Sequence, residues 1–173
     1  MKKLLSIIVI AVVLAATLIV PTASAESKPY TITYTNITGW NLRLARPLES
    51  VMTMQGSHLF IYMEEAGYIP YVLVELYNFK SEEEFMDALT EAMRDAYADL
   101  KVVSPAHKTV VGGKECYEIR YTYTIQGYLI TDRRIAITHY GRTFEFGSVE
   151  LEELNQTVGN LLEDMLQNSA FYD

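Results

Sequence analysis

Residues 115–149 read ECYEIRYTYTIQGYLITDRRIAITHYGRTFEFGSV, and this stretch decides the fold. It holds three runs rich in β-branched and aromatic residues, separated by the pairs Gln126-Gly127 and Tyr140-Gly141. Two-residue loops that end in glycine close antiparallel hairpins, because glycine adopts the positive φ that a primed turn requires. The sequence therefore predicts a three-stranded antiparallel meander.

The register across the second loop can be read from the alternation of side chains. It places Ile137 opposite Phe144 and Ile135 opposite Phe146. Side chains that face each other across a strand pair lie on the same face of the sheet, so these four form one apolar face.

The register across the first loop is less regular. Continued without interruption, it would set Ile119 opposite Arg134, an apolar side chain opposite a charged one. One extra residue within 131–134 would restore Ile119 opposite Ile135. A one-residue slip turns every side chain to the other face, so we predict a β-bulge at 131–134.

The beginning of the chain has the pattern of an export signal. Two lysines precede an uncharged apolar run from Leu4 to Val20, and small residues end at Ala25. This order is typical of a signal peptide over residues 1–25, cleaved after Ala25, which leaves residues 26–173 as a single domain. The alternative is that Leu4–Val20 remains as a membrane anchor, since it is only slightly shorter than a bilayer span.

Charge and cysteine content limit the functional classes. The formal net charge is −8, and loss of the two N-terminal lysines makes it −10. An acidic domain is unsuited to nucleic acid, whose phosphates require clustered Lys and Arg. Cys116 is the only cysteine, so the domain has no internal disulfide and depends on its hydrophobic core.

The remaining sequence predicts more strands and two helices. Strands are expected within 30–44 and at 51–54, 59–63 and 71–76. A helix should begin at Ser81, which forms a capping box with Glu84, and continue to Leu100. A second helix should span Glu150–Gln167. The predicted fold class is α+β, an antiparallel sheet of about six to seven strands with two main helices packed on it, an α/β/α sandwich being one form of it.

Residues that could carry chemistry are scattered. No motif for a serine hydrolase, a zinc protease, a phosphate loop or a dinucleotide cofactor occurs, so we predict no catalytic, cofactor or metal residues. The three histidines, His58, His107 and His139, are expected at the surface or in turns. Cys116 has no neighbouring base and is expected to be half-buried. Four charged residues of the meander are predicted to lie together on its outer face as a candidate partner surface: Glu118, Arg120, Arg134 and Glu145.

The order of elements resembles the family of the PsbP extrinsic subunit of photosystem II, whose fold is shared with a Ran-binding nuclear import factor. The resemblance rests on an early strand at Gly39-Trp40 before Pro47, the capped helix from Ser81, the segments GGKECYEIRYTYTIQG (112–127) and RTFEFGSV (142–149), and the ending Asn168–Phe171. It implies an antiparallel sheet with helices usually on both sides, and an exported, typically non-catalytic protein that binds partners or small or lipidic ligands.

Three functional hypotheses follow. The leading one is an exported, non-enzymatic binding or assembly module that acts on a protein partner in the extracytoplasmic space or envelope. The second is a carrier of an apolar or lipidic ligand between sheet and helices, suggested by core-facing Met86, Met93, Met165, Tyr121 and Tyr123. The third is a hydrolase assembled from distant residues such as His139, Glu118 and Asp132, which requires that they converge.

Overall fold

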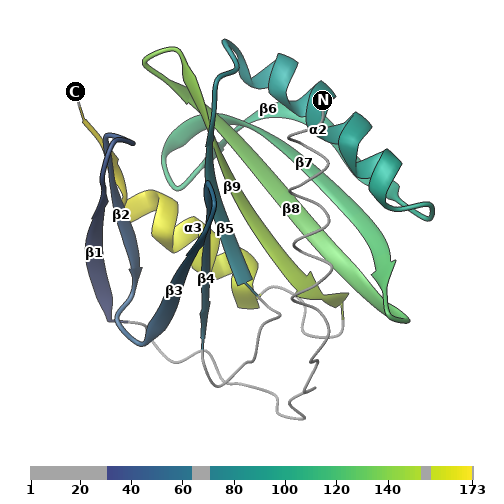
Figure 1. Ribbon diagram of the computed structural model, residues 1–173, viewed down its shortest axis with the longest axis horizontal. Helices are drawn as coiled ribbons and strands as arrows, with labels where there is room; N and C mark the ends of the chain where they lie inside the picture. Colours follow the sequence, from purple (N-terminus) through teal and green to yellow (C-terminus); the bar gives the residue numbers. More distant parts are fainter. Residues whose placement is uncertain (1–30, 64–70, 153–156, 173) are drawn as a thin grey trace.

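The computed structural model describes residues 31–63, 71–152 and 157–172. Within them, a twisted seven-stranded antiparallel sheet in the order β3-β4-β5-β9-β8-β7-β6 forms the body, and a small sheet in the order β1-β2-β10 lies beside it (Figure 1). The large sheet comprises β3 (Ser50–Gln55), β4 (His58–Met63), β5 (Tyr71–Tyr77), β6 (Lys101–Val111), β7 (Lys114–Ile125), β8 (Tyr128–His139) and β9 (Arg142–Leu151), and the small one β1 (Ile32–Ile37), β2 (Leu42–Pro47) and β10 (Ala170–Phe171). The predicted α+β fold class is confirmed.

The meander is β7–β8–β9, and its two loops are the predicted ones. Gln126 and Gly127 have φ of 52° and 86°, and Tyr140 and Gly141 have φ of 47° and 70°. Positive φ at both central residues is the signature of a type I′ turn, which matches the right-handed twist of the strands. The register across the second loop pairs Ile137 with Phe144, as predicted.

The bulge predicted at residues 131–134 is wrong. β7 pairs with β8 without a shift, so Ile119 does lie opposite Arg134, and β8 pairs with β9 equally regularly. The physical reason is that Arg134 is buried among acidic side chains and does not need to face solvent. The register irregularities of the meander region lie instead between β6 and β7, at Val102/Ser104 and Ser104/His107.

β6 is a strand that the sequence interpretation missed. The predicted helix continued to Leu100, but α2 (Glu82–Ala96) ends at Ala96 with Tyr97 as its C-cap, and β6 begins at Lys101. Pro105 lies inside β6, which is possible because β6 is the last strand of the sheet, where a missing N–H breaks no ladder. Ser81 caps α2 as expected, its hydroxyl accepting the N–H of Glu84 at 3.2 Å.

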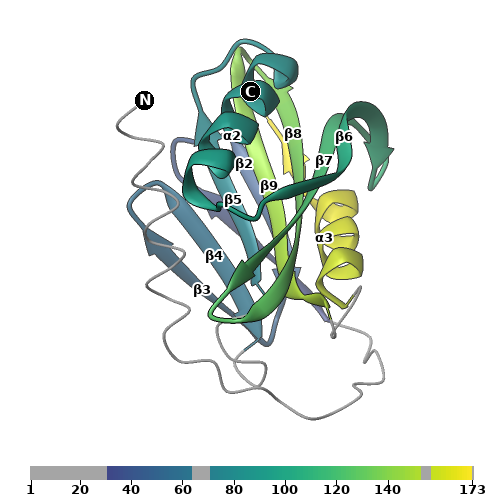
Figure 2. The same cartoon turned by 90° about the vertical axis from the view of Figure 1, so that its right-hand side faces the viewer.

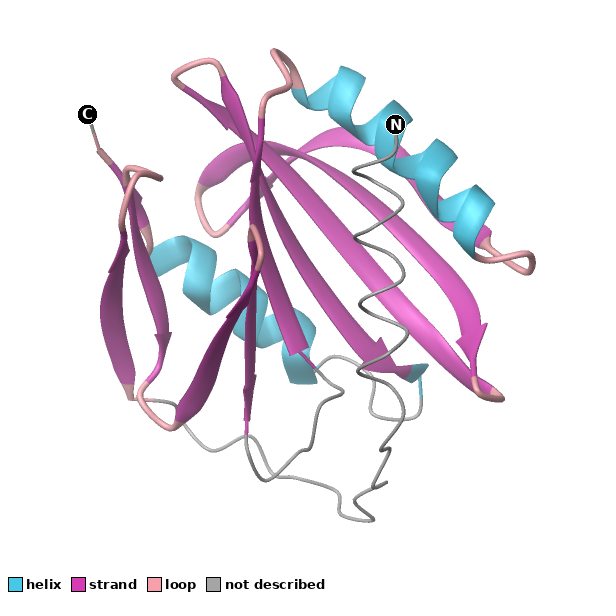
Figure 3. Cartoon of the chain, in the orientation of Figure 1, coloured by secondary structure: helices cyan, strands magenta, loops and turns pink. Residues whose placement is uncertain are grey.

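Each face of the large sheet carries one helix, which makes the α/β/α arrangement the correct form of the predicted architecture (Figures 2 and 3). Phe85, Met86, Leu89 and Met93 of α2 pack on a face rich in tyrosine. Leu161, Leu162, Met165 and Leu166 of α3 (Thr157–Asn168) pack on the opposite face, with aliphatic side chains and phenylalanines. No helix within the described residues is both long and apolar enough to cross a membrane.

The end of the chain returns to the body of the protein. α3 begins later than predicted, because Glu150 and Leu151 belong to β9. Phe171 of β10 pairs with β2 and its ring lies 4.9 Å from that of Phe144. Gly112 allows the β6–β7 turn to approach α3, since a Cβ there would lie 2.5 Å from the backbone nitrogen of Gln167. The predicted signal segment, residues 1–25, lies outside the described residues.

Candidate functional site

Five ionisable side chains lie side by side on the face covered by α2, and we call them the charged row: His58, Glu75, Glu145, Arg134 and Asp132. Strand pairing places Glu75 between His58 on β4 and Glu145 on β9. Arg134 and Asp132 follow on β8, opposite Gly147 and Val149 of β9. None of the five is more than 6% exposed, so the row is part of the interior.

Arg134 joins two acidic side chains. Its guanidinium donates to both carboxylate oxygens of Asp132, at 2.7 Å for Nη2 to Oδ2, and to Glu145 Oε1. The Tyr123 hydroxyl adds a bond of 2.9 Å to Asp132. Gly147 makes room for this side chain, because a Cβ there would lie 2.9 Å from Arg134 Cδ. A glycine inside a strand is typical of such close approaches.

Glu75 organises the other half of the row. One carboxylate oxygen lies 2.9 Å from His58 Nδ1 and accepts the Ser57 hydroxyl at 2.7 Å, and the other accepts the Tyr77 hydroxyl at 2.6 Å. Buried polar groups are stable when their hydrogen bonds are satisfied, and Glu75 meets this condition. His58 is therefore a buried neighbour of Glu75, which corrects the prediction of a surface or turn histidine.

Glu145 is less well compensated. Burial raises the pKa of its carboxyl, Arg134 opposes that change, and the neighbouring Glu75 adds to it. Its Oε2 is buried without a hydrogen-bond partner among the described residues. Burial also raises the pKa of Tyr123 and Tyr77 far above the usual range, so these tyrosines act as hydrogen-bond donors and not as bases. The row is shielded from solvent.

An open groove lies beside the row, between α2 and β6. It has a volume of about 580 Å³, within the range of ligand sites. We call it the α2–β6 groove. Its lining is divided by element: the charged and polar wall comes from α2 and the apolar wall and floor from the sheet, with Asp87, Thr90, Glu91, Arg94, Val102, Pro105, Ala106 and Ile119.

The irregular register of β6 explains why the groove lies there. Val102 pairs with Tyr121 and His107 pairs with Glu118. Four residues of β6, 103–106, lie between these two pairs, whereas β7 has only two, 119 and 120. Bulges bend a strand and redirect its side chains. Pro105 and Ala106 lie within this irregular part of β6, and Ile119 of β7 forms the floor.

Residues 87, 90, 91 and 94 form one face of α2, since three- and four-residue steps bring side chains to the same side of a helix. The Thr90 hydroxyl already has partners within the protein: it donates a hydrogen bond to Met86 O and lies 2.8 Å from the Tyr121 hydroxyl. Asp87, Glu91 and Arg94 are exposed and form no ion pair with any residue that the structure describes. Their charges are directed to solvent and are available to a partner.

The four residues predicted as one partner surface do not share a face. Arg134 and Glu145 belong to the charged row beneath α2, whereas Glu118 and Arg120 lie on the face of α3. The Glu118 carboxylate forms ion pairs with Arg120 at 2.6 Å and with Arg133 at 2.7 Å. Arg133 also forms an ion pair with Glu163 of α3 at 2.7 Å. Only Arg120 is exposed. The absence of a bulge at residues 131–134 is the reason for this division.

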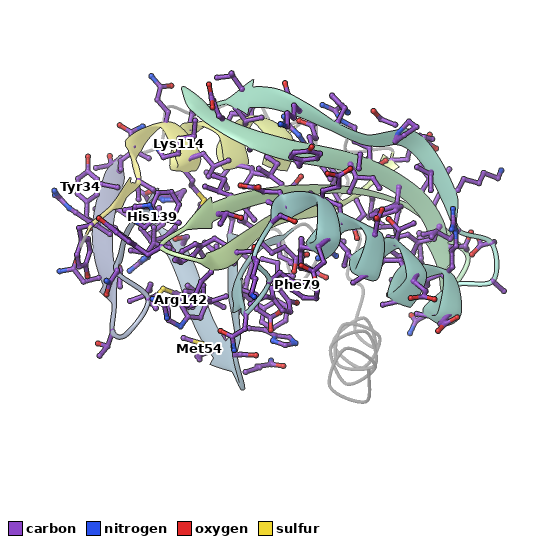
Figure 4. All side chains as sticks on the ribbon, turned by 90° about the horizontal axis from the view of Figure 1, so that it is seen from above. Tyr34, Met54, Phe79, Lys114, His139 and Arg142 are labelled. Carbon is purple, nitrogen blue, oxygen red and sulfur yellow. The ribbon has the colours of Figure 1, made fainter. Side chains whose placement is uncertain are left out.

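The residues of the hydrolase hypothesis are not brought together. Asp132 faces α2 and Glu118 faces α3, on opposite sides of the sheet. His139 lies at the end of β8, beside Arg142 and the small sheet, with its ring 5.1 Å from that of Phe171 (Figure 4). Cys116 is buried in the core and not half-buried as predicted, and burial raises the pKa of its thiol to about 11. Within the described residues, no group of three or more His, Cys, Asp or Glu could hold a metal ion.

The five side chains that suggested an apolar ligand are buried in the hydrophobic core. Met86 and Met93 of α2 and Tyr121 and Tyr123 of β7 are buried between the helix and the sheet, and Met165 is buried on the other face. None of the five lines the α2–β6 groove. The groove itself was missed because no strand was expected between the helix predicted to end at Leu100 and the meander. The signal in the sequence was Pro105 within a run of β-branched residues, which is typical of an edge strand.

Neither a protein-family model nor a curated protein sequence matches the chain. Solved structures do match it. The chain is similar to cyanobacterial PsbP (CyanoP) from Synechocystis sp. PCC 6803, with a TM-score of 0.64 and 13% identity over 88% of this chain and 99% of that one. The resemblance inferred from element order is thereby confirmed at the level of the fold.

Two further structures share the fold. LpqN of Mycobacterium tuberculosis, involved in cell envelope biogenesis, matches with a TM-score of 0.53 and 11% identity over 84% of this chain and 87% of that one. A protein of Bacteroides thetaiotaomicron matches with a TM-score of 0.56 and 12% identity over 78% of this chain and 46% of that one. At such identities the likeness concerns the fold, and function has to be argued from the site.

Proposed function

We propose that this protein is an exported, non-catalytic binding module that holds a segment of a protein partner in the α2–β6 groove. The observation that carries the proposal is the groove itself: an open site of about 580 Å³ that combines an apolar floor with charged side chains that no described residue pairs. Protein-binding sites commonly place apolar contacts at the centre and polar groups at the rim.

The location of the titratable groups supports a binding role over a catalytic one. Catalysis requires a base or nucleophile within reach of a substrate. The charged row is buried, and the carboxylates of the groove, Asp87 and Glu91, are exposed to solvent and have no histidine or cysteine beside them among the lining residues. The N-terminal signal pattern and the fold shared with an envelope-biogenesis protein support action outside the cytoplasm.

Site-specific photo-crosslinking in the producing cells tests the proposal. A photoreactive amino acid replaces Ala106 in the groove, and in the matched control it replaces Val110, which is exposed on the same strand but outside the groove. We expect a discrete protein adduct from position 106 and none from position 110. Equal labelling at both positions, or labelling only at position 110, would show that the groove is not the contact surface.

Cell fractionation tests the location separately. A cleaved chain that begins after Ala25 and is found outside the cytoplasm is the expected product. An uncleaved chain in the membrane fraction would favour the anchor formed by Leu4–Val20, and a cytoplasmic chain would contradict export.

A further inference from the structure

The groove has a chemistry that restricts its occupant. We infer that it takes a short segment that carries an apolar side chain flanked by Lys or Arg, with the apolar group over Ile119 and the cations against Asp87 and Glu91. This inference rests on the proposed function, because it names the kind of partner that the same groove accepts.

The apolar part of the inference comes from the sheet side. Val102, Pro105 and Ala106 line one wall, and Ile119 forms the floor. Pro105 and Ala106 are exposed, so an apolar side chain that covers them would remove apolar surface from water. A volume of about 580 Å³ is sufficient for a few side chains but not for a folded domain.

The cationic part comes from α2. Asp87 and Glu91 are one helical turn apart on the groove wall, and neither is neutralised by a described residue. The wall continues an acidic surface, since the exposed side chains of α2 include Glu83, Glu84, Asp87, Glu91 and Asp95. Arg94 is the only cation of the lining. The local charge, like the formal charge of −8, favours a basic partner.

The edge of β6 argues against a longer strand-like occupant. Added strands require a regular row of backbone donors and acceptors. β6 has two register irregularities, lacks a donor at Pro105 and carries Lys101 and Lys108, features that protect an edge from pairing. The occupant is therefore held by its side chains in the groove and is short.

Selection of peptides tests this chemistry. The full chain is immobilised, random dodecapeptides are selected on it, and the Kd of the strongest binder is measured by fluorescence anisotropy. We expect binders with one or two large apolar residues beside Lys or Arg. For the binder, D87N/E91Q should weaken binding about fivefold, because each exposed ion pair contributes only modestly. R94Q should strengthen it, since it removes the cation that repels the ligand.

Two control variants separate the possible failures. E84Q/D95N removes the same charge from α2 outside the groove lining and should leave the Kd within about twofold. A106W fills the groove and should abolish binding, whereas V110W on the same strand should not. If A106W abolishes binding but the binders are acidic or indifferent to D87N/E91Q, the inferred chemistry is wrong and the groove remains the site. If A106W has no effect, the proposed function fails as well.

Discussion

The two faces of the large sheet are built on different principles. Beneath α3, aliphatic side chains and phenylalanines form one cluster, and on the same face Arg133 pairs with both Glu118 and Glu163 of the helix. Beneath α2, the charged row crosses the interior, surrounded by tyrosines whose hydroxyls donate to it. The same sheet therefore has one face held by apolar packing and one face organised by paired charges.

The charged row lies on the same face of the sheet as the proposed α2–β6 groove. Buried ion pairs are costly to desolvate and contribute little net stability, but removal of one partner leaves an uncompensated buried charge. Here the row fixes Tyr123 and Arg134 beneath the helix that supplies one wall of the groove. On the face of α3, Leu161, Leu162, Met165 and Leu166 pack closely on the sheet.

The largest expected effect follows from breaking the row at Arg134. R134M leaves Asp132 and Glu145 buried without their cation, and we expect a loss of about 3–5 kcal/mol of unfolding free energy. Urea denaturation followed by circular dichroism measures it. The triple variant D132N/R134M/E145Q removes the charges together and should recover most of the loss. A single variant as stable as the wild type would show that the row is not paired as described.

A smaller effect is expected from the space that Arg134 needs. G147A places a methyl group 2.9 Å from Arg134 Cδ, and the guanidinium cannot move without leaving Asp132 or Glu145, so we expect a loss of about 1–3 kcal/mol. Ser148 is the next residue and faces the other side of the sheet. S148A removes a buried hydroxyl that has no partner among the described residues, so the unfolding free energy should stay the same or rise. Equal effects of both substitutions would contradict the difference between the faces.

The sequence allowed the α+β fold and the meander to be predicted, but not the difference between the two faces of the sheet. The loops Gln126-Gly127 and Tyr140-Gly141 carry strong local turn chemistry, which tertiary contacts do not override. Arg134 was expected to face solvent because periodicity treats every charge as exposed. Its burial depends on Asp132, Glu145 and the missing side chain of Gly147, a combination that appears only when the strands are paired.

The two faces should also respond to pH with opposite signs. Burial would raise the pKa of Glu118, but the guanidiniums of Arg133 and Arg120 outweigh it and hold this pKa below its usual value. Burial raises the pKa of Glu145. The contribution of Glu118 to stability is therefore present above its unfolded pKa and lost as pH falls through the folded one. That of Glu145 is present below its unfolded pKa and lost as pH rises through the folded one.

Unfolding of the wild type, E118Q and E145Q between about pH 3 and pH 8 measures these slopes. Relative to the wild type, E118Q should lose stability as pH rises, and E145Q should gain it, each by an amount on the order of 1 kcal/mol. Slopes of the same sign would contradict the assignment of the two carboxylates to different environments.

The smallest effect on stability is expected in the groove. Ala106 is exposed, so A106W should change the unfolding free energy by less than about 0.5 kcal/mol while it blocks the site. Thermal denaturation of A106W beside V110W measures this. A loss of several kcal/mol for A106W alone would mean that the groove wall is part of the packed core.

Hydrogen exchange of the full chain, with and without a saturating peptide selected on it, tests the central claim most directly. The account predicts slower exchange in α2 around Asp87–Arg94 and in β6 around Val102–Ala106, with no change in α3. Protection confined to α3 or to the small sheet, with the α2–β6 groove unaffected, would contradict it.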